Sequence, residues 1–259
     1  NKAFQLEPNY VNGNHRFIFT ELLEMRHEWE RAEKSWIKAY DLDPKNYATL
    51  WGLSFHYLLR GNLEKSNIYL SKLKEMGLDW DSDYALEGWY NFYSQNIEAS
   101  IPYFKKTIAR SLNPKQFQYW IVWYDLLYAM GKSQKCDEID DLNFKNIWLE
   151  FENKERDRIA EKIYYAYVEF YCNGNSNVLG EFNDDEFMLE SRPNNYEYYF
   201  YTKTILLLES GKIEEALHII ENGYEFASAN YYFFLRHPAL LPLKDNQRFQ
   251  KILKKAAMD

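Results

Sequence analysis

The sequence predicts an all-α protein, built as a right-handed superhelix of antiparallel helix pairs with a C-terminal capping helix. Three observations lead to this expectation: the chain has only 10 Gly and 7 Pro among 259 residues, aromatic residues make up 19%, and glycines and prolines recur at a shared interval. A shortage of Gly and Pro disfavours a turn-rich β-sandwich. A fixed interval of tens of residues is typical of stacked helical repeats.

Two kinds of residue mark the repeat independently. A glycine that precedes a small residue by five positions occurs at Gly61, Gly131 and Gly211. A proline recurs at nearly the same interval, at Pro44, Pro114 and Pro193. The glycines lie 70 and 80 residues apart and the prolines 70 and 79, which corresponds to two units of about 34 to 40 residues.

Each unit is predicted to be a hairpin of two helices. Within residues 12–44, apolar residues recur at helical spacing on both sides of a polar break at 26–28. Pro44 ends the second helix, because a proline disfavours helix at the residue before it. Antiparallel helices cross closely only where a side chain is short, and successive units have a small residue at that position: Ala32, Ser66, Ser100, Cys136 and Ala216.

These residues resemble the tetratricopeptide repeat (TPR) pattern. Ala32, Trp36, Ala39 and Pro44 stand where that pattern has a small residue, an aromatic residue, a second small residue and a proline. The resemblance covers nearly the whole chain. It implies a right-handed TPR-type superhelix with a concave face that receives protein or peptide partners.

We expect one TPR-like solenoid over residues 1–259. Its parts are the tail of a preceding repeat (1–8), four TPR-like hairpins (9–142), a degenerate hairpin (143–193), a TPR-like hairpin (194–229) and a C-terminal cap (230–259). Because residues 1–8 resemble the end of a second helix, we expect further residues to precede them.

Two local expectations follow from the same pattern. The degenerate hairpin should have a helix over 159–172, a turn at 173–175 and an irregular second arm over 181–190. Pro102 should lie in the first turn of its helix, where the missing N–H is tolerated.

The end of the chain carries a narrower resemblance. Residues 234–253 are similar to the last residues of TPR regions in bacterial CadC-like winged-helix transcriptional activators and in some adenylate cyclases. The matching residues are Pro242, Leu243, Lys244, Arg248 and Phe249. The same stretch also predicts a capping helix, whose apolar face is formed by Phe249, Ile252, Leu253 and Ala256.

The cysteine pattern predicts no metal site and no disulfide framework. Cys136 and Cys172 lie in apolar helical patterns, without a CxxC pair or a Cys/His cluster at zinc spacing. We expect them to be reduced, buried thiols, although a single bridge could form in an oxidising compartment.

No catalytic motif is present, so the chain is not expected to be an enzyme or to bind a cofactor or metal. It lacks a phosphate-binding glycine loop, a GxSxG motif and an HExxH motif. The acidic run at 184–186 lacks the ligand spacing of a calcium loop. The net charge of −8 disfavours nucleic-acid binding, and no apolar run approaches the ~20 residues of a membrane-spanning helix.

The resemblance implies that the first helix of each hairpin lines a concave groove, and the predicted groove is strongly aromatic. The predicted partner-binding residues are Phe17, Glu21, Trp51, Phe55, Trp89, Phe92, Tyr93, Asp125, Tyr128, Tyr198 and Tyr201. Phe17 and Glu21 stand where chaperone-binding TPR domains have a basic clamp, which disfavours a C-terminal carboxylate as the ligand.

We expect a peptide or a partner helix to dock on this groove. Its chief anchors would be Trp51, Phe55, Trp89, Phe92 and Tyr128, since aromatic side chains bring large apolar area at low entropic cost. Glu21 and Asp125 would then select Lys or Arg on the partner. In the competing interpretation, Trp51 and Trp89 are core residues between repeats.

The predicted function is a non-catalytic protein–protein interaction or signal-sensing module. We expect it to be the C-terminal regulatory region of a bacterial transcriptional regulator whose DNA-binding domain lies outside this chain. The alternatives are the regulatory TPR region of a signalling enzyme such as an adenylate cyclase, and a small-molecule sensor with an enclosed pocket among its tyrosine-rich helices. A cytoplasmic location is favoured, and a periplasmic one would follow from a membrane anchor elsewhere in the protein.

Overall fold

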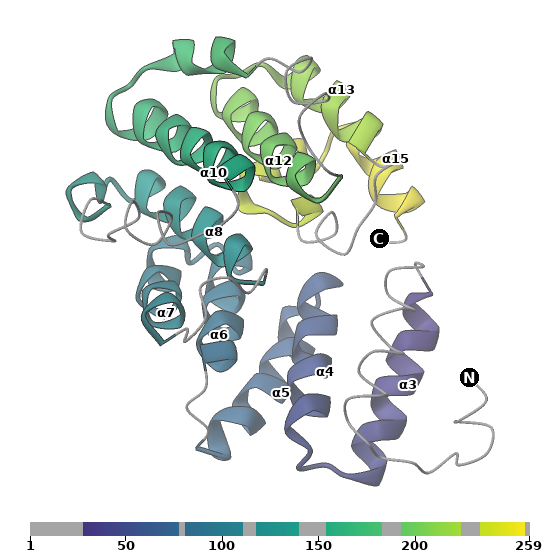
Figure 1. The fold of residues 1–259 in the computed structure, drawn as a ribbon. Helices are drawn as coiled ribbons and strands as arrows, with labels where there is room; N and C mark the ends of the chain where they lie inside the picture. Colours follow the sequence, from purple (N-terminus) through teal and green to yellow (C-terminus); the bar gives the residue numbers. More distant parts are fainter. Residues whose placement is uncertain are drawn as a thin grey trace.

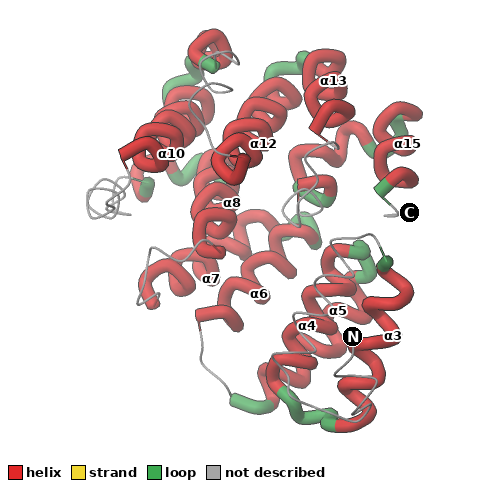
Figure 2. The backbone as a smooth tube through the Cα atoms, turned by 45° about the vertical axis from the view of Figure 1, so that its right-hand side comes forward, coloured by secondary structure: helices red, strands yellow, loops and turns green. Residues whose placement is uncertain are grey.

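The fold consists of helices and their connections. The computed structural model describes residues 28–77, 81–110, 118–139, 154–182, 193–223 and 234–256, and none of these residues forms a strand. Consecutive helices pack as antiparallel pairs along the array (Figure 1, Figure 2). The predicted all-α fold class is therefore confirmed. The expectations for residues 1–27, including Phe17 and Glu21, lie outside the described residues.

The first described helices are α3 (Trp29–Leu42), α4 (Tyr47–Leu59) and α5 (Leu63–Glu75). Two asparagines start the second and third of them: Asn46 accepts a hydrogen bond from the Thr49 N–H, and Asn62 accepts one from the Lys65 N–H. Gly61 joins α4 to α5 with a φ of 72°, a left-handed conformation that favours glycine.

The next helices are α6 (Asp81–Tyr93), α7 (Ile97–Arg110) and α8 (Gln118–Lys132). Glycines let neighbouring helices approach closely. A Cβ added at Gly52 would lie 2.3 Å from the Trp36 ring, and one added at Gly88 would lie 2.5 Å from the Phe104 ring. One such contact joins α3 to α4 and the other joins α6 to α7, so glycine–aromatic contacts set the distance between the two helices of each pair.

The prediction for Pro102 is wrong. Helix α7 begins at Ile97, so Pro102 is its sixth residue and lies inside the helix. The helix starts earlier because the turn before it is closed by Gln95, with a φ of 66°, and because Ser100 N–H donates to the Asn96 carbonyl. The Pro102 ring is exposed, so water can satisfy the carbonyl that loses its helical partner.

The described residues that follow α8 are irregular. They include a short 3-10 helix, η1 (Cys136–Glu138), and α10 (Lys154–Tyr167), which continues as a π-helix, η3 (Val168–Cys172), before the 3-10 helix η4 (Ser176–Glu181). The favoured expectation of reduced thiols is wrong, because Cys136 and Cys172 form a disulfide with their Cα atoms 5.7 Å apart. The sequence alone does not show that the end of η3 lies beside η1.

The last helices are α12 (Pro193–Glu209), α13 (Ile213–Gly223) and α15 (Gln247–Lys255), with the 3-10 helix η6 (Pro238–Leu243) before α15. Helix α15 packs on α13. Arg248 joins the two helices through ion pairs to Glu214 and Glu221, each at 2.6 Å. On the apolar face of α15, Phe249, Ile252 and Leu253 are buried.

The C-terminal part of the chain returns to the first described helices. Trp29 Nε1 on α3 donates a hydrogen bond to the Ala256 carbonyl at 3.2 Å, across 227 residues of sequence. Figure 1 shows α15 above the upper end of α3, with the C-terminus between them. The TPR resemblance implies an open concave face, whereas here the chain's own C-terminal residues close it.

Candidate functional site

Residues 234–243 lie on the concave face and form the centre of the candidate site. Pro238 starts η6, and His237 caps it, because His237 Nδ1 accepts a hydrogen bond from the Ala239 N–H at 3.1 Å. Leu240 and Leu243 are buried, whereas Leu241 is 50% exposed. We call residues 234–243 the closing segment.

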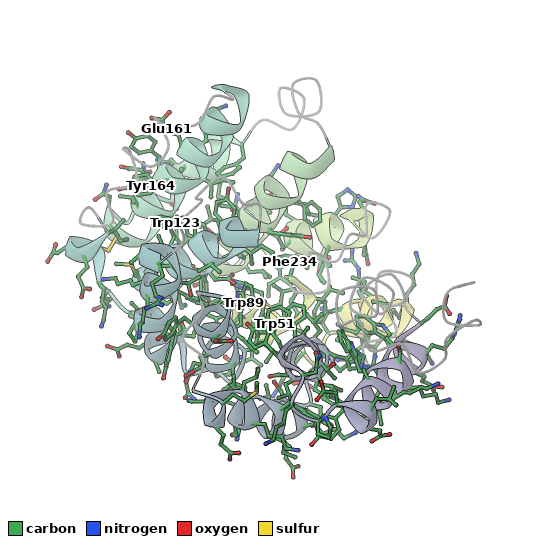
Figure 3. The ribbon with its side chains drawn as sticks, turned by 60° about the horizontal axis from the view of Figure 1, so that its bottom comes forward. Trp51, Trp89, Trp123, Glu161, Tyr164 and Phe234 are labelled. Atoms are coloured by element: carbon green, nitrogen blue, oxygen red, sulfur yellow. A yellow bond between two sulfur atoms is a disulfide. The ribbon has the colours of Figure 1, made fainter. Side chains whose placement is uncertain are left out.

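Aromatic residues on α6, α8 and α12 contact the closing segment. The His237 ring contacts two rings that also contact each other, with centroid distances of 5.1 Å to Phe92 on α6 and 4.6 Å to Tyr128 on α8. Phe234 stacks on Tyr201 of α12 at 4.4 Å. Figure 3 shows Phe234, Trp89 and Trp51 toward the centre of the molecule.

Arg236 fixes the segment to the end of α4. Its Nε donates to the Leu59 carbonyl and its Nη2 to the Arg60 carbonyl, both at 3.2 Å. Carbonyls at a helix C-terminus have no partner within the helix and carry partial negative charge, which a guanidinium neutralises. Arg236 therefore caps a helix that precedes it by about 180 residues.

Asp125 lies beneath the closing segment and is almost fully buried. Trp89 Nε1 donates to Asp125 Oδ2 at 2.9 Å, and Asp125 Oδ1 faces His237 Nε2 at 3.7 Å, which is longer than a hydrogen bond. Because His237 Nδ1 accepts from the Ala239 N–H, the ring proton resides on Nε2, as in a neutral imidazole.

Burial keeps both of these groups uncharged near neutral pH. Loss of solvation raises the pKa of Asp125 to about 8, although the hydrogen bond from Trp89 opposes the change. The same loss of solvation lowers the pKa of His237 to about 3. The pair is therefore not an ion pair, despite its short separation.

A cavity of about 30 Å³ lies beside Asp125. Its walls come from α6, α8, α10, α12 and the closing segment, and its lining residues are Tyr93, Ile121, Tyr124, Asp125, Tyr167, Tyr201, Thr202, Ile205, Phe234 and His237. One water molecule needs about 10–15 Å³ of such volume, so the cavity has room for two or three water-sized groups.

A second aromatic group lies on α4 and α6. Trp51 stacks on Phe55 at 4.9 Å, and Phe55 lies 5.9 Å from Trp89. Trp51 Nε1 donates to the Ser82 carbonyl at 3.1 Å, which fixes the indole against the start of α6. Trp51 and Phe55 are half-buried, whereas Trp89 is buried.

The structure brings most of the sequence-predicted site residues together. Trp89, Phe92, Asp125 and Tyr128 are buried under the closing segment, and Tyr93 and Tyr201 line the cavity. Trp51 and Phe55 lie beside them. The side chain of Tyr198 is outside the described residues, as are Phe17 and Glu21.

The residues of the closing segment are not among the site residues that the sequence predicts. Phe234, Arg236 and His237 were assigned only to a cap, and Tyr167 to a degenerate repeat. A signal was present in the sequence. The run Phe234–Leu243 holds two prolines and the polar pair Arg236–His237 within apolar residues, a composition unlike that of a simple capping helix.

Neither a metal cluster nor an acid–base–nucleophile chain is found among the described residues. They contain no group of three His, Cys, Asp or Glu side chains placed to hold a metal ion. Asp125 and His237 form no chain with a nucleophile of the kind that acyl transfer needs. Among the helices that the structure describes, none is long and apolar enough to cross a membrane.

Comparisons with known proteins give one distant structural similarity. No family model matches the chain, and no curated protein matches it. One solved structure is similar, with 13% sequence identity and a TM-score of 0.43, over 98% of this chain and 96% of the other: the crystal structure of YrrB, described as a TPR protein with an unusual peptide-binding site. The TPR-like fold of the present chain rests on its own helix pairs.

Proposed function

We propose that this protein is a non-catalytic protein–protein interaction module whose concave face binds a short, proline-containing apolar segment. The observation that carries the proposal is that the closing segment lies between α4, α6, α8 and α12 and contacts residues of all four helices. Phe92, Tyr128 and Tyr201 form aromatic walls, and the Leu59 and Arg60 carbonyls at the end of α4 accept hydrogen bonds from Arg236. A partner's segment of similar chemistry can use the same features.

In the absence of a partner, the chain's own closing segment fills this site. A tethered segment is present at a high effective concentration, so a partner must exceed its affinity or weaken its attachment. The arrangement therefore favours partners that engage more of the molecule than the concave face alone.

The test uses substitutions in the full chain that detach the closing segment from the concave face. Leu240→Asp/Leu243→Asp places two carboxylates at buried positions of the closing segment and should release it. Leu241→Asp is the matched control, because Leu241 is half exposed. A fluorescent peptide with the sequence of residues 232–245 is then titrated against each protein.

We expect the double variant to keep its helical circular dichroism and to bind the peptide with micromolar affinity. The unsubstituted protein and Leu241→Asp should bind at least tenfold more weakly. A peptide with alanine in place of the arginine and histidine should also bind weakly. If the double variant unfolds, or if it binds no peptide, the closing segment is only a part of the core and the proposal fails.

For the biological context, we propose a regulatory region of a bacterial transcriptional regulator. The proposal is supported by the resemblance of the residues from Pro242 to Phe249 to the end of the TPR regions in those regulators. The Cys136–Cys172 bridge favours the version in which this region lies in an oxidising compartment, such as the periplasm, since disulfides are rare in the cytosol. A winged-helix sequence in the same gene would support this context, and a cyclase domain there would support the adenylate cyclase alternative instead.

A further inference from the structure

The cavity beside Asp125 combines one acid with aromatic walls. Asp125 is the one carboxyl group among the lining residues, and neither Lys nor Arg lines the cavity. Its Oδ2 accepts from Trp89 at 2.9 Å, and its Oδ1 lies 3.7 Å from His237 Nε2, which is longer than a hydrogen bond. One oxygen of a buried carboxyl group can therefore accept a further hydrogen bond.

The walls suit a cation that carries carbon atoms. Tyr93, Tyr124, Tyr167 and Tyr201 contribute aromatic rings, and rings attract cations through their quadrupoles. Ile121 and Ile205 add apolar surface, which favours methyl or methylene groups over the water shell of a metal ion.

The size of the cavity restricts the ligand further. A volume of about 30 Å³ accepts two or three water-sized groups. An ammonium group with one or two carbons fits this volume. A primary ammonium also has three N–H donors, and the lining offers two acceptors for them, Asp125 Oδ1 and the hydroxyl of Thr202.

From these observations we propose that the cavity beneath the closing segment binds a small primary ammonium group, with Asp125 as its counter-ion. This cavity adjoins the binding site of the closing segment, since Phe234 and His237 of that segment form one of its walls. The ligand class is an alkylamine or the amino end of a slender molecule.

Binding should release a proton. Burial raises the pKa of Asp125 to about 8, so the free carboxyl group is mostly protonated at pH 7. When the ammonium cation enters, the carboxyl group loses its proton to the buffer and the cation remains paired with the carboxylate. Tyr93, Tyr167 and His237, which also face the cavity, are uncharged in both states, because burial raises the pKa of both tyrosines and lowers that of His237.

The test is calorimetric titration of the full chain with methylammonium and ethylammonium chloride at pH 7, in buffers of different ionisation enthalpy. Ethanol is the uncharged analogue of ethylammonium, and potassium chloride controls for ionic strength. Asp125→Asn removes the charge but keeps an acceptor for Trp89. Asp41→Asn, at an exposed position on α3, is the matched control.

We expect saturable binding of both amines, release of nearly one proton, and at least tenfold weaker binding of ethanol and potassium. Asp125→Asn should weaken amine binding at least tenfold and abolish proton release, whereas Asp41→Asn should change neither. No binding of the amines would mean that the cavity holds only water, and equal binding of ethanol or potassium would mean that it does not recognise an ammonium group; either result overturns the proposal. If Asp125→Asn does not fold, the comparison of ethylammonium with ethanol on the unsubstituted protein still decides it.

Discussion

Asp125 and His237 come from distant parts of the sequence and meet where the closing segment crosses α8. Each is buried without an opposite charge, and burial therefore favours the neutral form of both. The sequence analysis placed Asp125 in an open groove as a selector for basic partners. Its position along α8 was predictable from the helical period, but its burial depends on a segment 112 residues further along the chain.

We predict that the stability of the protein falls as the pH rises from about 6.5 to about 8. The pKa of Asp125 is about 8 in the folded protein and 3.8 in the unfolded chain, so the folded state binds more protons between these values and loses stability with rising pH. His237, with a pKa of about 3 when folded and 6.5 when unfolded, has the opposite effect. The two effects nearly cancel up to about pH 6.5, and above it Asp125 acts alone.

The expected loss is about 2 kcal/mol over this window, at about 1.4 kcal/mol per pH unit. Urea unfolding of the wild type and of Asp125→Asn at a series of pH values measures it as a difference between the two proteins. A difference that stays constant from pH 6.5 to 8 would show that Asp125 is already ionised, and would contradict the neutral pair.

At the scale of elements, the sequence predicted the local parts of the fold well. The turns at Gly61 and Gly211 have left-handed φ values of 72° and 75°, as a glycine that ends one helix and begins another predicts. These features depend on neighbours within a few residues. The start of α7 five residues before Pro102 and the bridge between Cys136 and Cys172 depend on long-range packing, so periodicity could not predict them.

Gly88→Ala should destabilise the protein by about 1–3 kcal/mol. A Cβ at this position would lie 2.5 Å from the Phe104 ring, which is itself fully buried and cannot move away. Gly180→Ala is the control, since a Cβ there meets nothing within 4 Å and its φ is not left-handed. Thermal unfolding compares the two variants, and equal melting midpoints would show that α6 and α7 do not approach as closely as described.

Removal of the disulfide should lower the free energy of unfolding by about 3–4 kcal/mol, because the bridge closes a long loop in the unfolded chain. The two cysteines are 36 residues apart in sequence. The double variant Cys136→Ser/Cys172→Ser should melt like the reduced wild type, and a reductant should not change the variant further. Two titratable thiols in the native, unreduced protein would rule the bridge out.

At the scale of the whole molecule, the curvature of the array brings its two ends together. Trp29 on α3 reaches the Ala256 carbonyl, and Arg236 reaches the end of α4. The TPR resemblance could predict the concave face and its aromatic residues, but the occupant of that face depends on how every hairpin adds to the curvature. A sequence pattern with a period of one repeat contains no information on that sum.

Arg236→Ala should destabilise the protein by about 1–3 kcal/mol, because two carbonyls at the end of α4 lose their donor in a half-buried place. Lys254→Ala, at an exposed position on α15, should leave the stability nearly unchanged. Urea unfolding provides the comparison. Equal stability of the two variants would mean that Arg236 is solvated and that the ends of the array are not joined.

The central claim is that the closing segment fills the concave face, and NMR of the His237 ring tests it most directly. In the wild type at neutral pH, we expect nuclear Overhauser effects from the His237 ring to the rings of Phe92 and Tyr128, whose centroids lie 5.1 and 4.6 Å away. During acid titration the imidazole should stay neutral well below its ordinary pKa of 6.5. A ring that titrates near 6.5 and shows no contact with either aromatic residue would place the segment in solvent and contradict the account.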